Sequence, residues 1–267
     1  MSIRLCSLSS GSSGNCIYVG TESTGLLVDC GVSGKEILEN LKNIGVCTST
    51  IKGILVTHEH SDHTKGIGVI SRKLNVPIYA NAKTWAGIGD SIGKISAENI
   101  RHFDTGVGFE LNELEVKSYS IPHDASDPVG YSFRLGSRKV CIATDLGYFS
   151  DEVRENTKGA DMVLLEANHD IEMVKVSSYP YFLKRRILSD VGHLSNEAAG
   201  LAVLELLNSG VRKVLLGHLS KENNFPELAY QTVKNILEEN QVTIGEDIEL
   251  EVAPRKGISR YYQIDQE

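Results

Sequence analysis

Short apolar runs alternate along the chain with longer segments in which apolar residues recur every three or four positions. In the segment 35–43, Ile37, Leu38 and Leu41 share one helical face, whereas the uninterrupted apolar run at 25–28 is typical of a buried strand. By these criteria, strands are predicted at 17–19, 25–28, 53–57, 77–80, 130–134, 139–143, 162–165 and 213–216, and two more within 106–121 around a turn at 111–113. Helices are predicted at 35–43, 64–74, 196–208 and 226–239.

Strands that alternate with helices in this way imply β-sheets covered by helices, which is an α/β architecture. The sequence has 267 residues and no low-complexity linker that divides it, so we expect one domain over residues 1–267. Its 41% of hydrophobic and 23% of charged residues are typical of a globular protein.

Composition narrows the expected location and partners. There is no stretch of about 20 apolar residues to cross a membrane, and the opening sequence MSIRLCSLSSGSSGN lacks the apolar core of a secretory signal. The five cysteines show no CxxC spacing and suit a reducing compartment, so we expect a cytoplasmic protein without a membrane partner. The formal net charge of −8 argues against a protein that coats nucleic acid, but it allows a nucleic acid substrate held by a metal site or a local basic patch. The oligomeric state is left open.

Histidine and aspartate residues follow four of the predicted strands directly. GLLV runs into Asp29, GILVT into His58, KVCIAT into Asp145 and KVLLG into His218. If these strand ends lie at one edge of a sheet, the four side chains converge on a rigid scaffold, which suits a catalytic site.

The densest group of such side chains is the run His58-x-His60-x-Asp62-His63. His58 and His60 are two positions apart, so in an extended segment they point the same way and can share one metal ion. Asp62 and His63 follow where the chain turns into the next helix. Imidazole and carboxylate ligands suit Zn²⁺, Mn²⁺ or Fe²⁺. The alternative is a solvated, histidine-rich helix start, which a position directly after a buried strand disfavours.

This HxHxDH motif after a buried strand resembles the metallo-β-lactamase superfamily, and the resemblance extends to Asp29, His123, Asp145 and His218 in the family's order. The segments SLSSGSSGNC, LLVDCG, THEHSDH, EANHD and GHLSNE are similar to the YycJ/WalJ group of bacterial proteins. That group is described as 5′-to-3′ exonuclease-like and is related to PhnP and RNase Z. The resemblance covers the chain from residue 3 to about residue 263.

The resemblance implies an αββα sandwich of two mixed sheets flanked by helices, with two divalent metal ions, zinc or manganese with iron as a further option, at one edge. A hydroxide bridging the two metals would attack the scissile phosphate. The implied ligands of the first ion are His58, His60 and His123, those of the second are Asp62, His63 and His218, and Asp145 bridges both ions.

Further roles are implied by the same resemblance. Asp62, Glu166 and His193 are expected to be catalytic, with Glu166 steering His193 as it protonates the leaving oxygen. The alternative for this pair is a buried carboxylate near a helix cap at Ser195. Asp29 is expected to support a metal ligand by hydrogen bonds rather than to bind metal itself.

Substrate contacts are expected from Asn15, in the Gly/Ser-rich opening segment, and from Ser220 and Asn223, which follow His218. His169 could support the site or lie on the surface, and His102 is expected to be structural or exposed.

The segment 175–186 interleaves Tyr179, Tyr181 and Phe182 with three consecutive basic residues, Lys184 to Arg186. Positive groups beside aromatic rings suit single-stranded nucleic acid. The alternative is a solvated cationic helix whose aromatic side chains lie in the core.

Together these features predict a dinuclear-metal phosphodiesterase, acting as a 5′-to-3′ exonuclease on DNA. Between Asp145 and His218 there is no room for the clamp domain of larger nucleases in the superfamily. One alternative is a small-molecule hydrolase that acts on a cyclic phosphodiester as PhnP-like proteins do, with thioesters and lactams ranked lower. Another is a non-catalytic regulatory protein of the same fold.

Overall fold

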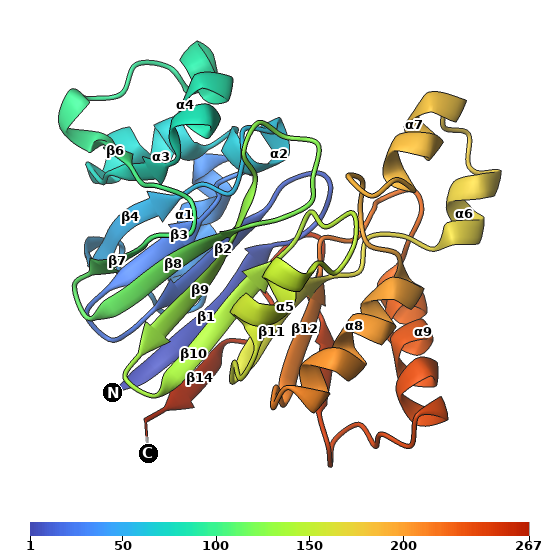
Figure 1. Ribbon diagram of the computed structural model, residues 1–267. Coiled ribbons are helices and arrows are strands. Elements are labelled where there is room, and N and C mark those ends of the chain that lie inside the picture. Colours follow the sequence, from blue (N-terminus) through green and yellow to red (C-terminus); the bar gives the residue numbers. More distant parts are fainter. Residues whose placement is uncertain (267) are drawn as a thin grey trace.

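The computed structural model describes residues 1–266, which form two seven-stranded β-sheets packed face to face (Figure 1). The strand orders are β14-β1-β2-β3-β4-β5-β6 and β13-β12-β11-β10-β9-β8-β7. The strands of the first sheet are β1 (Ser2–Ser9), β2 (Cys16–Gly20), β3 (Gly25–Val28), β4 (Ile51–Leu55), β5 (Ile78–Ala80), β6 (Ile100–His102) and β14 (Tyr262–Asp265). Those of the second are β7 (Gly108–Leu111), β8 (Leu114–Ser120), β9 (Val129–Leu135), β10 (Arg138–Ala143), β11 (Met162–Glu166), β12 (Lys213–Gly217) and β13 (Glu249–Val252).

Each sheet is mixed, and its parallel half positions the site. Strands β3 to β6 pair in parallel in the first sheet, and β10 to β13 pair in parallel in the second. The carboxyl ends of parallel neighbours lie at the same edge of a sheet. The residues that follow β3 and β4 therefore lie beside one another, as do those that follow β10, β11 and β12.

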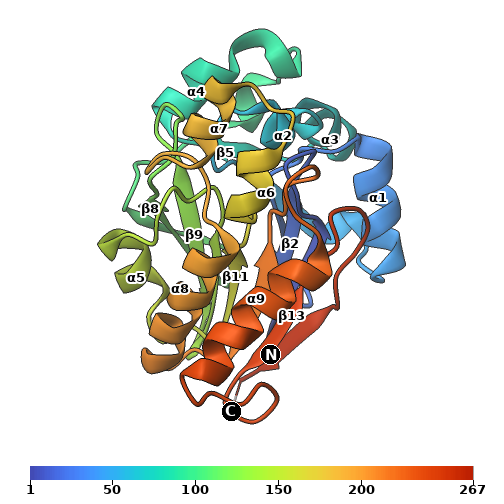
Figure 2. The same cartoon turned by 90° about the vertical axis from the view of Figure 1, so that its right-hand side faces the viewer.

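Helices cover the outer face of each sheet and complete the αββα sandwich that the sequence predicts (Figure 2). The helices are α1 (Gly34–Asn43), α2 (Ser61–Thr64), α3 (Ile67–Leu74), α4 (Ala82–Ile88), α5 (Asp151–Thr157), α6 (Ile171–Val176), α7 (Tyr181–Ile187), α8 (Asn196–Asn208) and α9 (Pro226–Glu239). Short 3-10 turns lie at Thr48–Thr50, Gly89–Ile92 and Ala97–Asn99. Ile37 of α1 and Ile67 of α3 are buried in one cluster with residues of the first sheet, and Val203 of α8 and Val233 of α9 in another with residues of the second.

The layer between the sheets is apolar. Tyr131 and Phe133 of β9 belong to one buried cluster with Leu5 of β1 and Val28 of β3, and all four are 0% exposed. Burying side chains of this size contributes about 1.5–3 kcal/mol each. This layer holds the two sheets, and therefore the residues at their edges, in a fixed relative position.

Three of the four predicted helices match the structure to within one residue. α8 begins after Ser195, whose hydroxyl accepts a hydrogen bond from the backbone N–H of Ala198 at 3.1 Å. α9 begins with Pro226, which is favoured in a first turn because its missing N–H is not needed there.

The prediction of a single helix over 64–74 is wrong, because this part of the chain forms two helices and the first begins before residue 64. Helix α2 already begins at Ser61, and the chain bends at Lys65 and Gly66 before α3. The N–H of Gly66 donates to the carbonyl of Cys30 at 2.6 Å, and a Cβ at this position would lie 2.3 Å from the carbonyl oxygen of Val32. Close packing against the loop after β3 therefore breaks the helix.

Several elements were missed by the sequence pattern. Strand β1 carries serines at Ser2, Ser7 and Ser9, so its sequence does not look apolar although these residues are buried. β6, β13 and β14 are short strands at sheet edges, and α4 to α7 have at most seven residues each. Among the helices of residues 1–266, none has the length and hydropathy needed to span a membrane.

Candidate metal centre and active-site pocket

The residues that follow β3, β10 and β12 share an unusual backbone conformation. Asp29, Asp145 and His218 have φ angles of 59°, 61° and 55°, in the left-handed region that non-glycine residues rarely adopt. Such conformations cost on the order of 1–3 kcal/mol and cluster at functional sites. The sharp turns at these strand ends place the three side chains at the edge of the sandwich.

The first cluster consists of His58, His60 and His123. The Nε2 atom of His58 lies 3.0 Å from Nδ1 of His60, which lies 3.3 Å from Nε2 of His123. Imidazole nitrogens bound to one zinc ion at roughly 2.0–2.1 Å in a tetrahedron lie roughly 3.3 Å apart. The three nitrogens are therefore spaced as ligands of one ion are.

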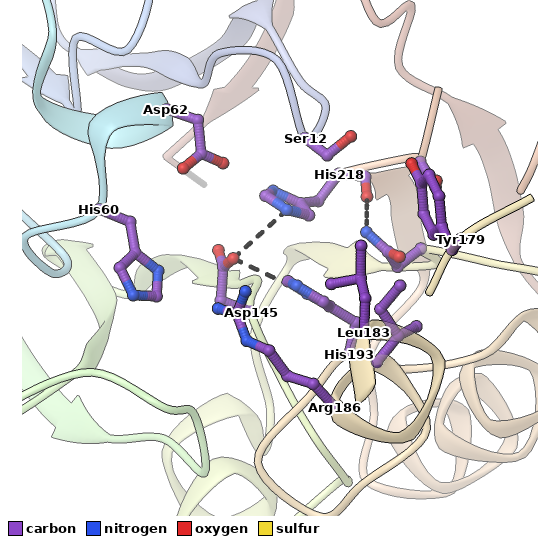
Figure 3. Close-up of a pocket in the computed structure, with 12 residues that line it drawn as sticks. Ser12, His60, Asp62, Asp145, Tyr179, Leu183, Arg186, His193 and His218 are labelled. Carbon is purple, nitrogen blue, oxygen red and sulfur yellow. Dashed lines mark hydrogen bonds and ion pairs between the residues drawn. The ribbon is translucent and has the colours of Figure 1, made fainter. Parts of the chain in front are cut away.

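The second cluster consists of Asp62, His63 and His218, and Asp145 lies between the two clusters. His63 Nε2 is 3.5 Å from Asp62 Oδ2 and 3.5 Å from Asp145 Oδ2. His218 Nε2 is 3.3 Å from Asp145 Oδ1, which also lies 3.8 Å from Nε2 of His123. Figure 3 shows Asp145 at the centre of the pocket, with Asp62 on one side and His218 on the other.

Two buried atoms in this arrangement are suited to a metal ion. Asp145 is 2% exposed and His218 is 0% exposed, yet Asp145 Oδ2 and His218 Nε2 make no hydrogen bond with any described residue. A buried polar atom without a hydrogen bond costs about 1–3 kcal/mol. A divalent cation between the clusters would satisfy both atoms, so the residues present fit a metal centre.

Asp29 orients His63 by contacting the ring nitrogen that does not face the cluster. Its Oδ2 lies 2.7 Å from Nδ1 of His63 and accepts a hydrogen bond from the Thr57 hydroxyl at 2.8 Å. The Thr57 hydroxyl in turn lies 2.9 Å from Nδ1 of His58. With Nδ1 of both histidines held in this way, Nε2 is directed to the metal cluster. Asp29 thus lies where a supporting residue was expected.

Asn15 occupies a different place from the one expected. It is 1% exposed, and its Oδ1 lies 3.1 Å from Nδ1 of His218 and accepts from the N–H of Gly11 at 3.0 Å. Its Nδ2 lies 3.1 Å from Nε2 of His63, and Asn15 is not among the residues that line the pocket, so a direct substrate contact by Asn15 is not supported. His123 is held similarly, with Nδ1 3.1 Å from the Gly192 carbonyl oxygen.

The electrostatic environment favours a cation. Burial lowers the pKa values of His58, His123 and His218, which keeps these imidazoles neutral and able to bind metal. At His63 burial also lowers the pKa, but the carboxylates of Asp145, Asp62 and Asp29 outweigh it and raise the pKa well above its usual value. A site that attracts a proton this strongly also attracts a metal ion that replaces it.

Glu166 and His193 form a hydrogen-bonded pair beside the clusters. Glu166 is 0% exposed, and its Oε1 lies 2.8 Å from Nδ1 of His193. Its Oε2 accepts hydrogen bonds from the N–H groups of Leu146 at 2.6 Å and Leu194 at 3.1 Å. Burial lowers the pKa of His193, but Glu166, together with Asp145 and Asp62, outweighs it and the pKa rises to about 9. The expected pairing is present, and both acceptor atoms of the carboxylate are used.

The clusters and His193 open into one pocket of about 240 Å³. Ser220 lies in its wall as expected, whereas Asn223 is 0% exposed and does not line it. Asn168 was missed; it follows Glu166 in the EANHD segment, and its amide donates to the carbonyl of His218 at 2.8 Å. The pocket is lined by Ser12, His60, Asp62, Asp145, Asn168, Tyr179, Leu183, Arg186, Ile187, His193, His218 and Ser220.

Two of the remaining histidines lie outside the clusters. His102 is exposed on β6, as expected. His169 is 1% exposed, and its carbonyl accepts from the N–H of Asn196 at 2.8 Å, so the surface alternative is wrong. Burial lowers the pKa of His169 to about 4, so it is neutral beside the Glu166 loop.

The aromatic residues of the segment 175–186 are not all buried in the core. It spans the end of α6 and nearly all of α7, and its Tyr179 lines the pocket. Tyr181 and Phe182 are 76% and 73% exposed. The idea of a cationic helix with its aromatic residues in the core is therefore wrong for these two residues.

The fold and this site define a metal-dependent hydrolase, and the chain belongs to the metallo-β-lactamase superfamily. The family profile described as "Beta-lactamase superfamily domain" matches residues 24–219, which include every histidine and aspartate of the two clusters.

Named relatives cover nearly the whole chain. An "Exodeoxyribonuclease YycJ" of Bacillus anthracis is 43% identical over 250 residues, covering 94% of this chain and 95% of the relative. An "Exodeoxyribonuclease WalJ" of Streptococcus pneumoniae is 42% identical over 245 residues, covering 91% of each. These matches confirm the resemblance to the YycJ/WalJ group.

Among solved structures, a "New Diphosphatase from the PhnP Family" superposes with a TM-score of 0.66 at 18% identity, covering 100% of this chain and 99% of the other. This likeness confirms the expected relation to PhnP at the level of the fold.

Proposed function

We propose that this chain is a dinuclear-metal exodeoxyribonuclease that removes nucleotides from the 5′ end of DNA. The observation that carries the proposal is the position of Asp145 between two metal-ligating clusters that share one pocket with His193. Such a site suits phosphodiester hydrolysis, because two metal ions about 3.5–4 Å apart can hold both the attacking and the leaving oxygen.

The ligands would be divided between two ions. His58, His60 and His123 would hold the first, the second cluster defined above would hold the other, and Asp145 would be shared by both. Divalent ions bound there, zinc or manganese, polarise phosphoryl oxygens and lower the pKa of water towards neutrality.

The protein's own contribution to the chemistry is proton transfer. Glu166 holds Nδ1 of His193 at 2.8 Å, so Nε2 of His193 is the atom that can give its proton to the leaving 3′ oxygen. Leu146 and Leu194 fix Glu166 by their backbone N–H groups, and this fixes the orientation of the imidazole. Asp62 would act as a ligand that also lines the pocket.

DNA as substrate is supported by the relatives at 42% and 43% identity, which are named exodeoxyribonucleases. Polarity from the 5′ end rests on the resemblance to the same group. Ser220 and Ser12 line the pocket beside Asp145 and His218 and could donate hydrogen bonds to the phosphate.

The proposal is tested with linear DNA that carries a 5′-phosphate and a label at its 3′ end, incubated with Mn²⁺. We expect labelled products that shorten stepwise, and no shortening by the Asp145→Ala variant. With the label at the 5′ end, we expect a labelled mononucleotide from the first turnover. The opposite product pattern would reverse the polarity, and cleavage of circular DNA would replace the exonuclease with an endonuclease.

A wild-type protein that holds metal, leaves DNA intact and hydrolyses a small cyclic phosphodiester would contradict the proposal. It would instead favour the small-molecule hydrolase.

A further inference from the structure

Helix α7 exposes an apolar surface that a globular protein normally buries. Tyr181 and Phe182 in its first turn are 76% and 73% exposed, and Val176 at the end of α6 is 82% exposed. Figures 1 and 2 show α6 and α7 standing away from the sandwich, above the layer formed by α8 and α9. Large exposed groups of this kind mark binding surfaces.

The same helix forms part of the active-site wall. Leu183, Arg186 and Ile187 line the pocket, and Tyr179 lines it just before the helix begins. A strand whose scissile phosphate lies at Asp145 would therefore pass α7 within the first few nucleotides. Phe182 is four positions before the pocket-lining Arg186, so its exposed ring lies on the same side of α7 as that residue.

The charges on α7 suit a polyanion. Lys184, Arg185 and Arg186 are consecutive in a chain whose formal net charge is −8. Arg186 is engaged by Asp124, with Nη2 to Oδ1 at 2.9 Å, whereas the guanidinium of Arg185 lies 6.0 Å from the centre of the Tyr181 ring. An arginine stacked on an aromatic ring can contact both a phosphate and a base.

We propose that Tyr181, Phe182 and Arg185 bind the DNA strand next to the scissile phosphate by stacking against its bases. This inference rests on the proposed function and specifies how that site binds its substrate. Charge complementarity favours DNA over a second copy of this acidic chain as the occupant of the surface. Because every base has a face that can stack on an aromatic ring, binding of this kind does not depend on the DNA sequence. This suits an exonuclease that degrades any strand.

The test uses the metal-loaded enzyme and compares wild type with the double variant Tyr181→Ala/Phe182→Ala. Stacking on one aromatic side chain is worth roughly 5- to 140-fold in affinity per base, so we expect KM for a single-stranded oligonucleotide to rise at least roughly 5-fold. We expect kcat to stay within about 2-fold of wild type, because the variant leaves the metal ligands and His193 unchanged. Turnover of bis(p-nitrophenyl) phosphate, which is too small to reach α7, should be unchanged and so reports an intact site.

Two further variants sharpen the test. Tyr181→Phe/Phe182→Tyr keeps both rings and should retain the wild-type KM. Leu201→Ala removes a side chain of α8 that is 57% exposed, and should also leave KM unchanged.

An unchanged KM in the alanine double variant, with DNA still cleaved by wild type, would overturn the inference and leave the proposed function intact. An unchanged KM together with a loss of self-association, measured by light scattering, would assign the surface to a second copy instead. If wild type turns over bis(p-nitrophenyl) phosphate but not DNA, the proposed function fails and this inference fails with it.

Discussion

At the scale of single residues, Glu166 determines which nitrogen of His193 faces the pocket. One carboxylate oxygen is taken by two backbone N–H groups and the other by Nδ1 of His193. The carboxylate cannot rotate without losing these bonds, so the imidazole is held in one orientation. A general acid held in this way contributes about 10²–10⁴-fold to a rate when the leaving group needs a proton.

The variant His193→Ala tests this role. We expect kcat for DNA to fall by about 10²–10⁴-fold. Hydrolysis of bis(p-nitrophenyl) phosphate should fall much less, because p-nitrophenolate leaves without a proton. Parallel rate measurements on the two substrates give the comparison. Equal losses on both would show that His193 acts by holding the site together rather than by donating a proton.

Outside the site, Glu113 joins two turns through hydrogen bonds whose contribution to stability depends on pH. It accepts hydrogen bonds from the hydroxyls of Thr21, Ser23 and Thr24, and so joins the β2–β3 turn to the β7–β8 turn. Burial raises the pKa of Glu113, but the three hydroxyls together outweigh it and lower the pKa to about 2. A carboxyl group whose pKa is depressed stabilises the fold above its unfolded pKa, and this stabilisation is lost as the pH falls through the folded pKa.

The isosteric variant Glu113→Gln removes the charge only. At pH 7 we expect it to lower the free energy of unfolding by about 0.5–1 kcal/mol, a modest value because the group is partly exposed to solvent. The difference from wild type should shrink as the pH falls from the usual glutamate pKa of 4.5 to about 2, because the wild-type carboxylate takes up its proton there. Urea unfolding of both proteins across this range measures it, and a difference independent of pH would contradict the assignment.

At the scale of elements, strands with uninterrupted apolar runs were predictable and those with polar residues were not. β3 was predicted residue for residue, because GLLV is buried on both faces. β1 was missed because its serines are buried against neighbouring strands, a tertiary effect that hydropathy does not reveal. β14 alternates buried and exposed residues over only four positions at a sheet edge, which is too short to define a pattern.

The bend between α2 and α3 was equally invisible in the sequence, because it depends on contact with a loop more than 30 positions earlier. Gly66→Ala should place a methyl group 2.3 Å from the Val32 carbonyl oxygen, so the loop would have to move. We expect a destabilisation of about 1–3 kcal/mol, and a loss of metal affinity because α2 carries His63.

Thermal unfolding and metal content of Gly66→Ala measure both effects. Gly108→Ala is a matched control, since the new methyl group would lie 3.7 Å or more from its neighbours. A Gly66→Ala protein as stable as the control would contradict the packing argument.

At the scale of the whole molecule, the two halves of the chain supply complementary parts of the centre. The first sheet and its loops carry His58, His60, Asp62 and His63, and the second sheet carries Asp145, which we propose bridges the two ions. The apolar layer between the sheets fixes the distance between these halves. A metal centre built in this way depends on the whole fold rather than on one motif.

The clustering of His58, Asp145 and His218 could be predicted because these residues follow recognisable strands. The placement of Asn15 could not, since only the fold shows that the loop after β1 passes behind His218. Asn168 and Asp124 gave no separate signal beyond their nearness to Glu166 and His123. Residues that reach a pocket from a loop are set by tertiary packing, which the local pattern does not contain.

The central claim is that two metal ions, joined by Asp145, are needed for hydrolysis of DNA. It is tested most directly by removing metal with a chelator, adding Mn²⁺ back in steps, and measuring bound metal per chain and DNA cleavage in the same samples. We predict that activity rises as the second ion binds, to a stoichiometry of two, and that Asp145→Ala binds fewer ions and stays inactive. Full activity in wild type with one ion per chain, or with none, would contradict the account.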